Sequence, residues 1–130
     1  KHESDMYDEY GDVFFLTHFP YYTSPFWNMK KSPTPGSTGK DVAFKCDVII
    51  GGMETIGSAE RADDVDEMRE QFHTISEGEY ANLLYSLFGK ERVLKELDEF
   101  LEHDFMPRFG GGIGVTRMIS GMKKAGLLVA

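Results

Sequence analysis

The chain has 130 residues, of which 41% are hydrophobic and 13% aromatic, so it can form one globular domain with a core, or part of one. Twenty-two acidic residues against 14 basic ones give a net charge of −8, which argues against an electrostatic grip on nucleic acid by this segment alone. The single cysteine, Cys46, excludes an internal disulfide, and without an apolar run of roughly 20 residues or an evident signal peptide we expect a cytoplasmic chain with no membrane contact.

The first third of the chain predicts two strands and a loop. Residues 1–12 are polar and acidic, and Glu9-Tyr10-Gly11-Asp12 indicates a lead-in turn. Residues 13–19 are typical of a buried strand, which Pro20 ends because proline has no amide hydrogen to donate. Residues 25–30 predict a shorter strand, and residues 31–40, rich in serine, proline and glycine, predict a flexible hairpin loop.

The strongest strand pattern covers residues 42–50. Apolar residues alternate along it, whereas Lys45 and Asp47 lie on the other face. Gly51-Gly52 predicts a tight turn, after which residues 53–61 return as an antiparallel partner.

A helical insertion, residues 63–104, is expected next. Asp63 is expected to cap a helix over residues 65–72, and further helices are expected at residues 79–88 and 91–103. A glycine-rich strand and a last helix over residues 118–125 close the chain. The prediction is an α+β fold, an antiparallel sheet with flanking helices.

The glycine-rich strand is the first candidate binding element. Glycines at positions 110, 111, 112 and 114 remove side chains where another group can approach the backbone closely. Arg117 follows where a helical pattern begins, and its planar guanidinium can stack on a ring or bind phosphate. The pattern predicts the floor of a pocket for a flat ligand, although glycine runs also form turns and tight packing sites.

The predicted hairpin carries the second candidate site, formed by Asp47, Glu54, Ser58 and Arg61. Glu54 and Ser58 are an even number apart and are expected to share a face, whereas Arg61 needs a bulge, which Gly57 would permit. Carboxylates from two neighbouring strands can hold Mg²⁺ and so neutralise a triphosphate. The alternative is that Asp47 and Glu54 are surface charges of the hairpin.

These two elements resemble a known family. The run from Gly110 to Arg117 is similar to the third signature motif of class II aminoacyl-tRNA synthetases, with Gly111 in place of an apolar residue and Thr116 in place of a glutamate. Residues 46–48 and 54–61, with residues 19–29 before them, are similar to segments of the aspartyl and asparaginyl enzymes. The resemblance implies a partial class II catalytic domain over residues 1–130, with residues 109–126 as its third motif.

The resemblance also implies roles for individual residues. Asp47 and Glu54 would bind Mg²⁺ on ATP, and Arg117, with Gly112 and Gly114, would hold the nucleotide. Arg61, with Ser58 and Gly112, would bind aspartate or asparagine. The implied reaction is activation of the amino acid as an aminoacyl-adenylate, with Glu54 and Arg117 acting in catalysis. Glu60, in place of a glutamine, and Gly57, in place of a serine ligand, leave the choice of substrate open.

Two alternatives stay open at this point. The segment from residue 92 to Arg117 also resembles ammonia-dependent asparagine synthetase A, which amidates aspartate without tRNA and has a small hydroxyl residue where Thr116 stands. The chain could instead be a non-catalytic interaction module. Because the first two motifs of the class are not found in these residues, we expect the C-terminal part of a longer protein or a truncated relative. The resemblance implies a homodimer and, through the full-length protein, tRNA as a partner, whereas the chain alone is expected to be inactive.

Overall fold

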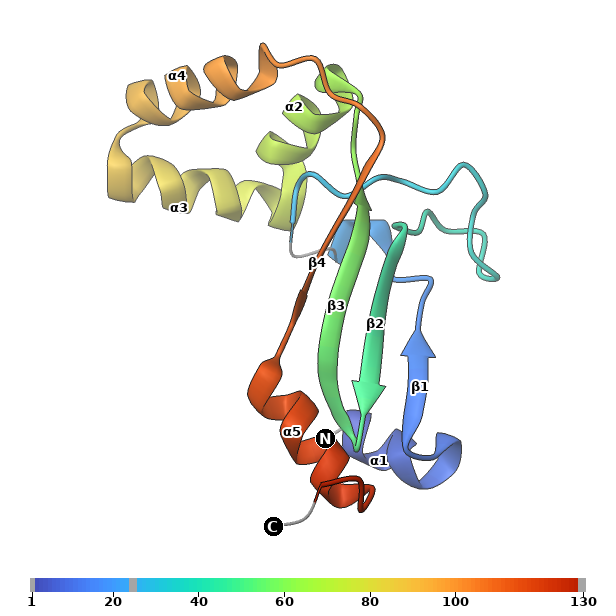
Figure 1. The fold of residues 1–130 in the computed structure, drawn as a ribbon. Helices are drawn as coiled ribbons and strands as arrows, with labels where there is room; N and C mark the ends of the chain where they lie inside the picture. The colour runs from blue at the N-terminus through green and yellow to red at the C-terminus, as the bar shows by residue number, and fades with distance from the viewer. Residues whose placement is uncertain (1, 24–25, 129–130) are drawn as a thin grey trace.

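The computed structural model describes residues 2–23 and 26–128, which form an α+β fold (Figure 1). In chain order its helices and strands are α1 (His2–Tyr10), β1 (Val13–Leu16), β2 (Lys45–Ile50), β3 (Met53–Arg61), α2 (Val65–Thr74), α3 (Glu79–Phe88), α4 (Lys90–Leu101), β4 (Arg108–Ile113) and α5 (Val115–Lys124). Short 3₁₀ helices lie at Tyr21–Thr23 and Ile75–Gly78. No helix in the described part of the chain is long and apolar enough to cross a membrane.

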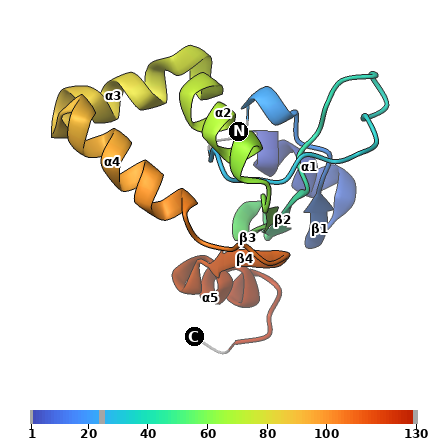
Figure 2. The ribbon, with the colours of Figure 1, turned by 90° about the horizontal axis from the view of Figure 1, so that it is seen from above.

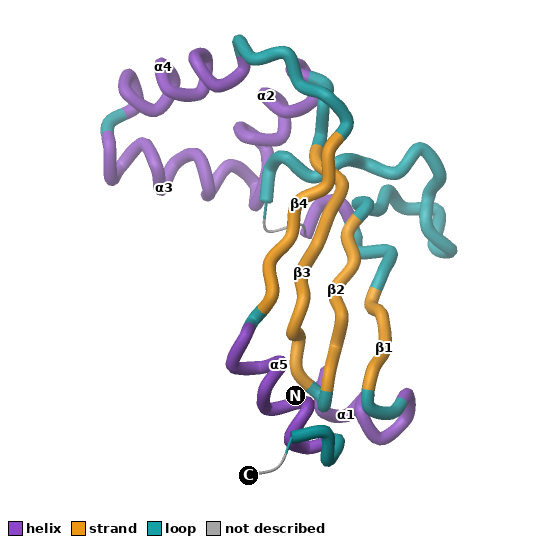
Figure 3. Tube along the Cα trace, in the orientation of Figure 1, coloured by secondary structure: helices purple, strands orange, loops and turns teal. Residues whose placement is uncertain are grey.

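The four strands form one antiparallel sheet in the order β1-β2-β3-β4 (Figure 3). The tight turn predicted between β2 and β3 is confirmed, with positive φ angles of 59° at Gly51 and 83° at Gly52 that favour glycine. β3 has the predicted bounds, whereas β2 begins at Lys45 rather than at residue 42. The prediction of an antiparallel sheet with flanking helices is therefore confirmed.

The edge strand β1 differs from its prediction. It ends at Leu16 instead of residue 19, and Val13 and Phe15 are 54% and 68% exposed, so the expectation of a buried strand is wrong. The strand predicted at residues 25–30 starts at a residue outside the described ranges; within it, Met29 forms only an isolated bridge to Arg61. The loop predicted at residues 31–40 is confirmed, since no regular helix or strand lies there.

Residues 2–10, expected only to be polar and acidic, form helix α1, which lies across the sheet from α5 (Figure 2). The lead-in turn expected at residues 9–12 falls at the C-terminal end of this helix, where Gly11 has a φ angle of 87°. Tertiary contacts hold the helix. The Glu3 carboxylate accepts a hydrogen bond of 3.2 Å from the backbone N–H of Glu54, and the ammonium of Lys124 lies 3.4 Å from the ring centre of Tyr7. A polar segment gives little periodicity from which such a helix could be predicted.

Helices α2 to α4 pack together at the end of the sheet far from the β2–β3 turn (Figure 1). Met68, Phe72 and Leu97 are buried in their common core, and the indole of Trp27 meets the ring of Phe72 edge-on at 5.5 Å. The cap of α2 is Asp64, whose side chain accepts from the N–H of Glu67, and not Asp63 as predicted.

Helix α5 rests on the sheet through a residue without a side chain. A Cβ atom at Gly121 would lie 2.6 Å from Cγ2 of Ile50, so the helix needs glycine there to approach β2.

We expect Gly121→Val to lower the free energy of unfolding by about 1–3 kcal/mol, because the added methyl groups force α5 away from the strand. Urea denaturation measures this change. Lys123→Ala, at an exposed position of the same helix, is the control and should change the free energy by less than about 0.5 kcal/mol. Equal stability of Gly121→Val and the wild type would contradict this packing.

Candidate functional site

One face of the sheet carries most of the residues singled out from the sequence. Paired residues of neighbouring strands share a face, and the register pairs Asp47 with Gly57, Gly57 with Gly112, and Ala59 with Gly110. Arg61 belongs to the same face, since it is two residues beyond Ala59. We call this surface, which includes Lys45, the glycine face.

A β-bulge brings Glu54 to the glycine face. Val48 pairs with Ile56 and Ile49 pairs with Glu54, so Thr55 is the extra residue. The expected bulge between Glu54 and Arg61 is therefore present, but at Thr55 rather than at Gly57.

The same bulge moves Ser58 away from Glu54. Ser58 pairs with Cys46 and Gly111, on the opposite face, and its hydroxyl donates a 3.0 Å hydrogen bond to the carbonyl of Cys46. The expectation that Ser58 shares a face with Glu54 is wrong, because even spacing holds only in an unbulged strand. The geometry gives no support to Ser58 as a substrate ligand.

The carboxylates of Asp47 and Glu54 meet above Gly57. A Cβ atom at Gly57 would lie 3.1 Å from Oε1 of Glu54 and 3.6 Å from Oδ1 of Asp47. The residue Asp47 is 4% exposed, and its Oδ1 has no hydrogen-bond partner among the described residues, although its Oδ2 pairs with the ammonium of Lys45. A buried carboxylate oxygen without a partner is costly, so this position favours a cation.

The donor set fits one kind of metal. No group of three or more histidine, cysteine or acidic side chains in the described ranges could hold an ion. Mg²⁺, however, is commonly bound by one or two carboxylates together with water and phosphate oxygens. Asp47 and Glu54 therefore suit Mg²⁺ that arrives with a polyphosphate better than a permanently bound metal.

Arg61 lies over a glycine of β4. A Cβ atom at Gly110 would lie 2.9 Å from Nε and 3.2 Å from Nη2 of Arg61, so any other residue at position 110 would displace the guanidinium. The ring of Phe26 lies 5.9 Å from Cζ. Since the described residues include no carboxylate paired with Arg61, its guanidinium N–H groups are available to donate to a carboxylate or amide of a ligand.

Arg117 closes the other end of the glycine face. It lies in the first turn of α5, which begins at Val115 and not at residue 118 as predicted. Its stem lies over Gly114, where a Cβ atom would come within 3.3 Å, and its Nη1 donates a 2.7 Å hydrogen bond to the backbone carbonyl of Glu54. The hairpin that bears Glu54 and the helix that bears Arg117 are thus in direct contact.

The glycines of β4 have two different functions. A Cβ atom at Gly111 would lie 2.8 Å from the carbonyl oxygen of Gly57, so this glycine allows close packing of β4 on β3. A Cβ atom at Gly112 would meet no atom of the described residues within 4 Å, so this glycine leaves open space beside the two carboxylates. The sequence predicted a pocket floor without side chains, and Gly112 has this property.

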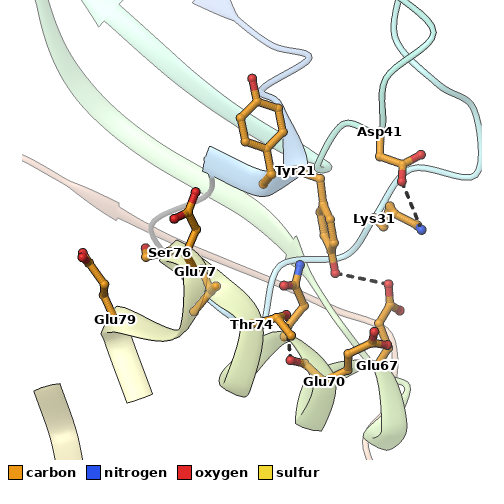
Figure 4. A pocket seen from close by; sticks show the side chains of 12 residues that line it. Tyr21, Lys31, Asp41, Glu67, Glu70, Thr74, Ser76, Glu77 and Glu79 are labelled. Carbon is orange, nitrogen blue, oxygen red and sulfur yellow. Dashed lines mark hydrogen bonds and ion pairs between the residues drawn. The ribbon is translucent and has the colours of Figure 1, made fainter. Parts of the chain in front are cut away.

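A cavity elsewhere in the molecule has the wrong charge for a nucleotide. It has a volume of about 660 Å³ and is lined by acidic side chains, including Glu67, Glu70 and Glu77 (Figure 4). Tyr21 borders it and donates a hydrogen bond to Glu67, and burial raises the pKa of the Tyr21 hydroxyl to about 12. Carboxylates would repel a triphosphate, so this cavity is not a candidate for its site.

Two contacts of the glycine face were not predicted from the sequence. Lys45 forms an ion pair with Asp47, and their spacing of two residues is compatible with this contact but does not by itself predict it. The contact of Glu3 with Glu54 joins residues far apart in the chain and has no local sequence signal.

Comparison with solved structures defines the class of fold. The asparaginyl-tRNA synthetase of Entamoeba histolytica superposes with a TM-score of 0.69 at 22% identity, covering 94% of this chain and 24% of that one. The asparaginyl-tRNA synthetase of Pyrococcus horikoshii, in complex with asparaginyl-adenylate, gives 0.64 at 22% identity, with coverages of 94% and 25%. The aspartyl-tRNA synthetase of Entamoeba histolytica gives 0.57 at 20% identity, with coverages of 91% and 21%. The chain has the fold of part of a tRNA synthetase.

The family follows from the sequence match. Residues 3–126 match the model of class II tRNA synthetases (D, K and N), and the chain belongs to this family. No curated protein sequence gives a significant match. The chain spans about a quarter of the length of the solved structures that it resembles.

Proposed function

We propose that this chain forms part of a catalytic domain that activates aspartate or asparagine with ATP and Mg²⁺ as an aminoacyl-adenylate. The glycine face supports the proposal: it brings the buried Oδ1 of Asp47, the carboxylate of Glu54 and the guanidinium of Arg61 onto one surface beside Gly112. Family membership agrees with this chemistry.

The spacing along β3 suits a small amino acid. The guanidinium of Arg61 lies over Gly110, which pairs with Ala59. Ala59 is two residues from Gly57, above which the two carboxylates meet, so these two positions are roughly 7 Å apart along the strand. Arg61 would bind the side-chain carboxylate or amide of the substrate and thereby direct its α-carboxylate toward the phosphate. Mg²⁺ held by Asp47 and Glu54 would neutralise phosphate oxygens when bound.

The reaction needs no protein nucleophile. An oxygen of the substrate carboxylate attacks the α-phosphorus, and pyrophosphate leaves. The protein contributes the relative position of the two reactants and the neutralisation of charge. Arg117 would hold the nucleotide from the N-terminal turn of α5.

Arg117→Ala is expected to weaken the binding of Mg·ATP about tenfold, because an exposed guanidinium that contacts a triphosphate is lost. Isothermal titration calorimetry with the chain measures the affinity. Arg92→Ala, which removes an exposed arginine of α4, is the control. Wild-type affinity of Arg117→Ala would contradict the assignment of Arg117 to the nucleotide.

The proposal as a whole is tested with asparaginyl- and aspartyl-sulfamoyl-adenosine, stable analogues of the adenylates. We expect the chain to bind one of them more tightly than ATP, since the analogue reaches both Arg61 and the nucleotide side. Absence of binding to ATP and to both analogues would overturn the proposal. The chain alone is expected to give no pyrophosphate exchange, as it does not contain the second motif of the class.

A second candidate is aspartate–ammonia ligation, which the similarity of the C-terminal segment, including Thr116, favours. Both candidates share the adenylation step and differ in the acceptor. A longer protein that contains this chain would discharge the adenylate to tRNA in one case and to ammonia in the other, so the product distinguishes them. We further propose a cytoplasmic location and a homodimer for the longer protein.

A further inference from the structure

The side chain of Lys45 is enclosed on the glycine face. It is 13% exposed, its ammonium lies 3.7 Å from the centre of the Phe19 ring, and it forms an ion pair with Oδ2 of Asp47. Long cationic side chains are seldom so buried without a specific partner. The contacts of Lys45 thus fix the carboxylate of Asp47 as well as its own ammonium.

The ion pair divides the two oxygens of Asp47. Oδ2 is occupied by Lys45, whereas Oδ1 is buried and has no partner among the residues that the structure describes. Oδ1 lies close to the position above Gly57 that Oε1 of Glu54 also approaches. Only one oxygen of Asp47 is therefore directed toward a cation between the two carboxylates.

Lys45 also changes the charge of the site. Its single positive charge cancels that of Asp47, so Lys45, Asp47 and Glu54 together carry the charge of one carboxylate. Arg117 and Glu3, which contact the backbone carbonyl and N–H of Glu54, add one charge of each sign and leave this balance unchanged. Such a site attracts a free divalent cation only weakly. A cation that is already bound to phosphate oxygens arrives with their negative charge and depends less on the charge of the site.

We propose that Lys45 is a positioning residue that makes metal binding on the glycine face depend on the nucleotide. This inference rests on the proposed function, since it requires a cation between Asp47 and Glu54. Lys45 holds Asp47 with one oxygen toward the metal and suppresses the binding of free metal by its charge. The site then selects the complex of metal and nucleotide over the metal alone.

The test uses Mn²⁺ in place of Mg²⁺ because its free form is measured directly by electron paramagnetic resonance. Two titrations of the chain are compared: Mn²⁺ without nucleotide, followed by resonance, and Mn·ATP, followed by calorimetry. The variants are Lys45→Gln, which keeps a hydrogen-bond donor for Asp47 without the charge, and Lys45→Arg, which keeps the charge.

In the wild type we expect Mn·ATP to bind and free Mn²⁺ to bind at least roughly tenfold more weakly. Lys45→Gln is expected to bind free Mn²⁺ roughly tenfold more tightly than the wild type, because one buried positive charge is removed, with a smaller change for Mn·ATP. Lys45→Arg should restore the weak binding of free Mn²⁺. Lys95→Gln, at an exposed lysine of α4 paired with Glu99, is the matched control and should behave as the wild type.

The outcomes separate the two proposals. If the wild type binds Mn·ATP but Lys45→Gln and the wild type bind free Mn²⁺ equally, the role of Lys45 is overturned while the metal site stands. If the wild type does not bind Mn·ATP, the metal site itself is wrong and the role of Lys45 falls with it. Should Lys45→Gln fail to fold, by circular dichroism, Lys45→Arg decides: a tenfold gain in free Mn²⁺ binding there would overturn the role of charge.

Discussion

Arg61→Ala is expected to weaken the binding of asparaginyl- or aspartyl-sulfamoyl-adenosine by roughly 100-fold or more. The guanidinium lies over Gly110 without a carboxylate partner among the described residues, and loss of one member of a charged, hydrogen-bonded pair at a binding site commonly costs 2–5 kcal/mol. The affinity for Mg·ATP should change far less, because in the proposed site Arg61 would contact the amino-acid part of the analogue. Calorimetry with both ligands measures this difference.

A second variant separates the position of Arg61 from its charge. Gly110→Ala keeps the arginine but places a Cβ atom 2.9 Å from its Nε, so we expect it to weaken analogue binding as well. Arg69→Ala is the control, because Arg69 forms an exposed ion pair with Asp98 on the helices. Equal losses for ATP and analogue in Arg61→Ala would mean that Arg61 does not read the amino acid.

Glu54→Gln is expected to weaken the binding of Mg·ATP by roughly 100-fold, since it removes the charge of one of the carboxylates that meet above Gly57. The substitution preserves the size of the side chain, and the backbone carbonyl of Glu54 still accepts from Arg117. Adenosine binds without a metal ion. The ratio of the affinity for Mg·ATP to the affinity for adenosine, compared between variant and wild type, therefore isolates the effect of Glu54 on metal binding.

Glu96→Gln serves as the matched control, at an exposed position of α4 where the glutamate pairs with Arg92. It should leave the binding of Mg·ATP and the fold unchanged. An affinity of Glu54→Gln for Mg·ATP within threefold of the wild type would show that Glu54 does not hold the metal.

Local sequence signals predicted the elements closest to the site well. The Gly51-Gly52 turn and the alternation on either side of it define β2 and β3, because turn chemistry and a period of two are local properties. The helices α3 and α4 follow their apolar spacing, and α3 has its predicted bounds.

The errors arose where distant contacts decide the structure. Helix α1 depends on Glu54 and Lys124, which no local pattern links to the N-terminus. The face of Ser58 depends on one extra residue, Thr55, and a bulge shifts every residue after it to the other face. The sequence predicted that a bulge was needed for Arg61, but its position depends on pairing with β2.

The interval between β3 and β4 has a consequence for folding. The β2–β3 hairpin closes through a two-glycine turn, whereas β4 joins the sheet only after the three helices α2 to α4. Closing the longer loop costs more chain entropy, so we expect the hairpin to gain hydrogen-exchange protection early and the amides of β4 later. The surface on which Arg61 lies over Gly110 is then completed in the last stage of refolding.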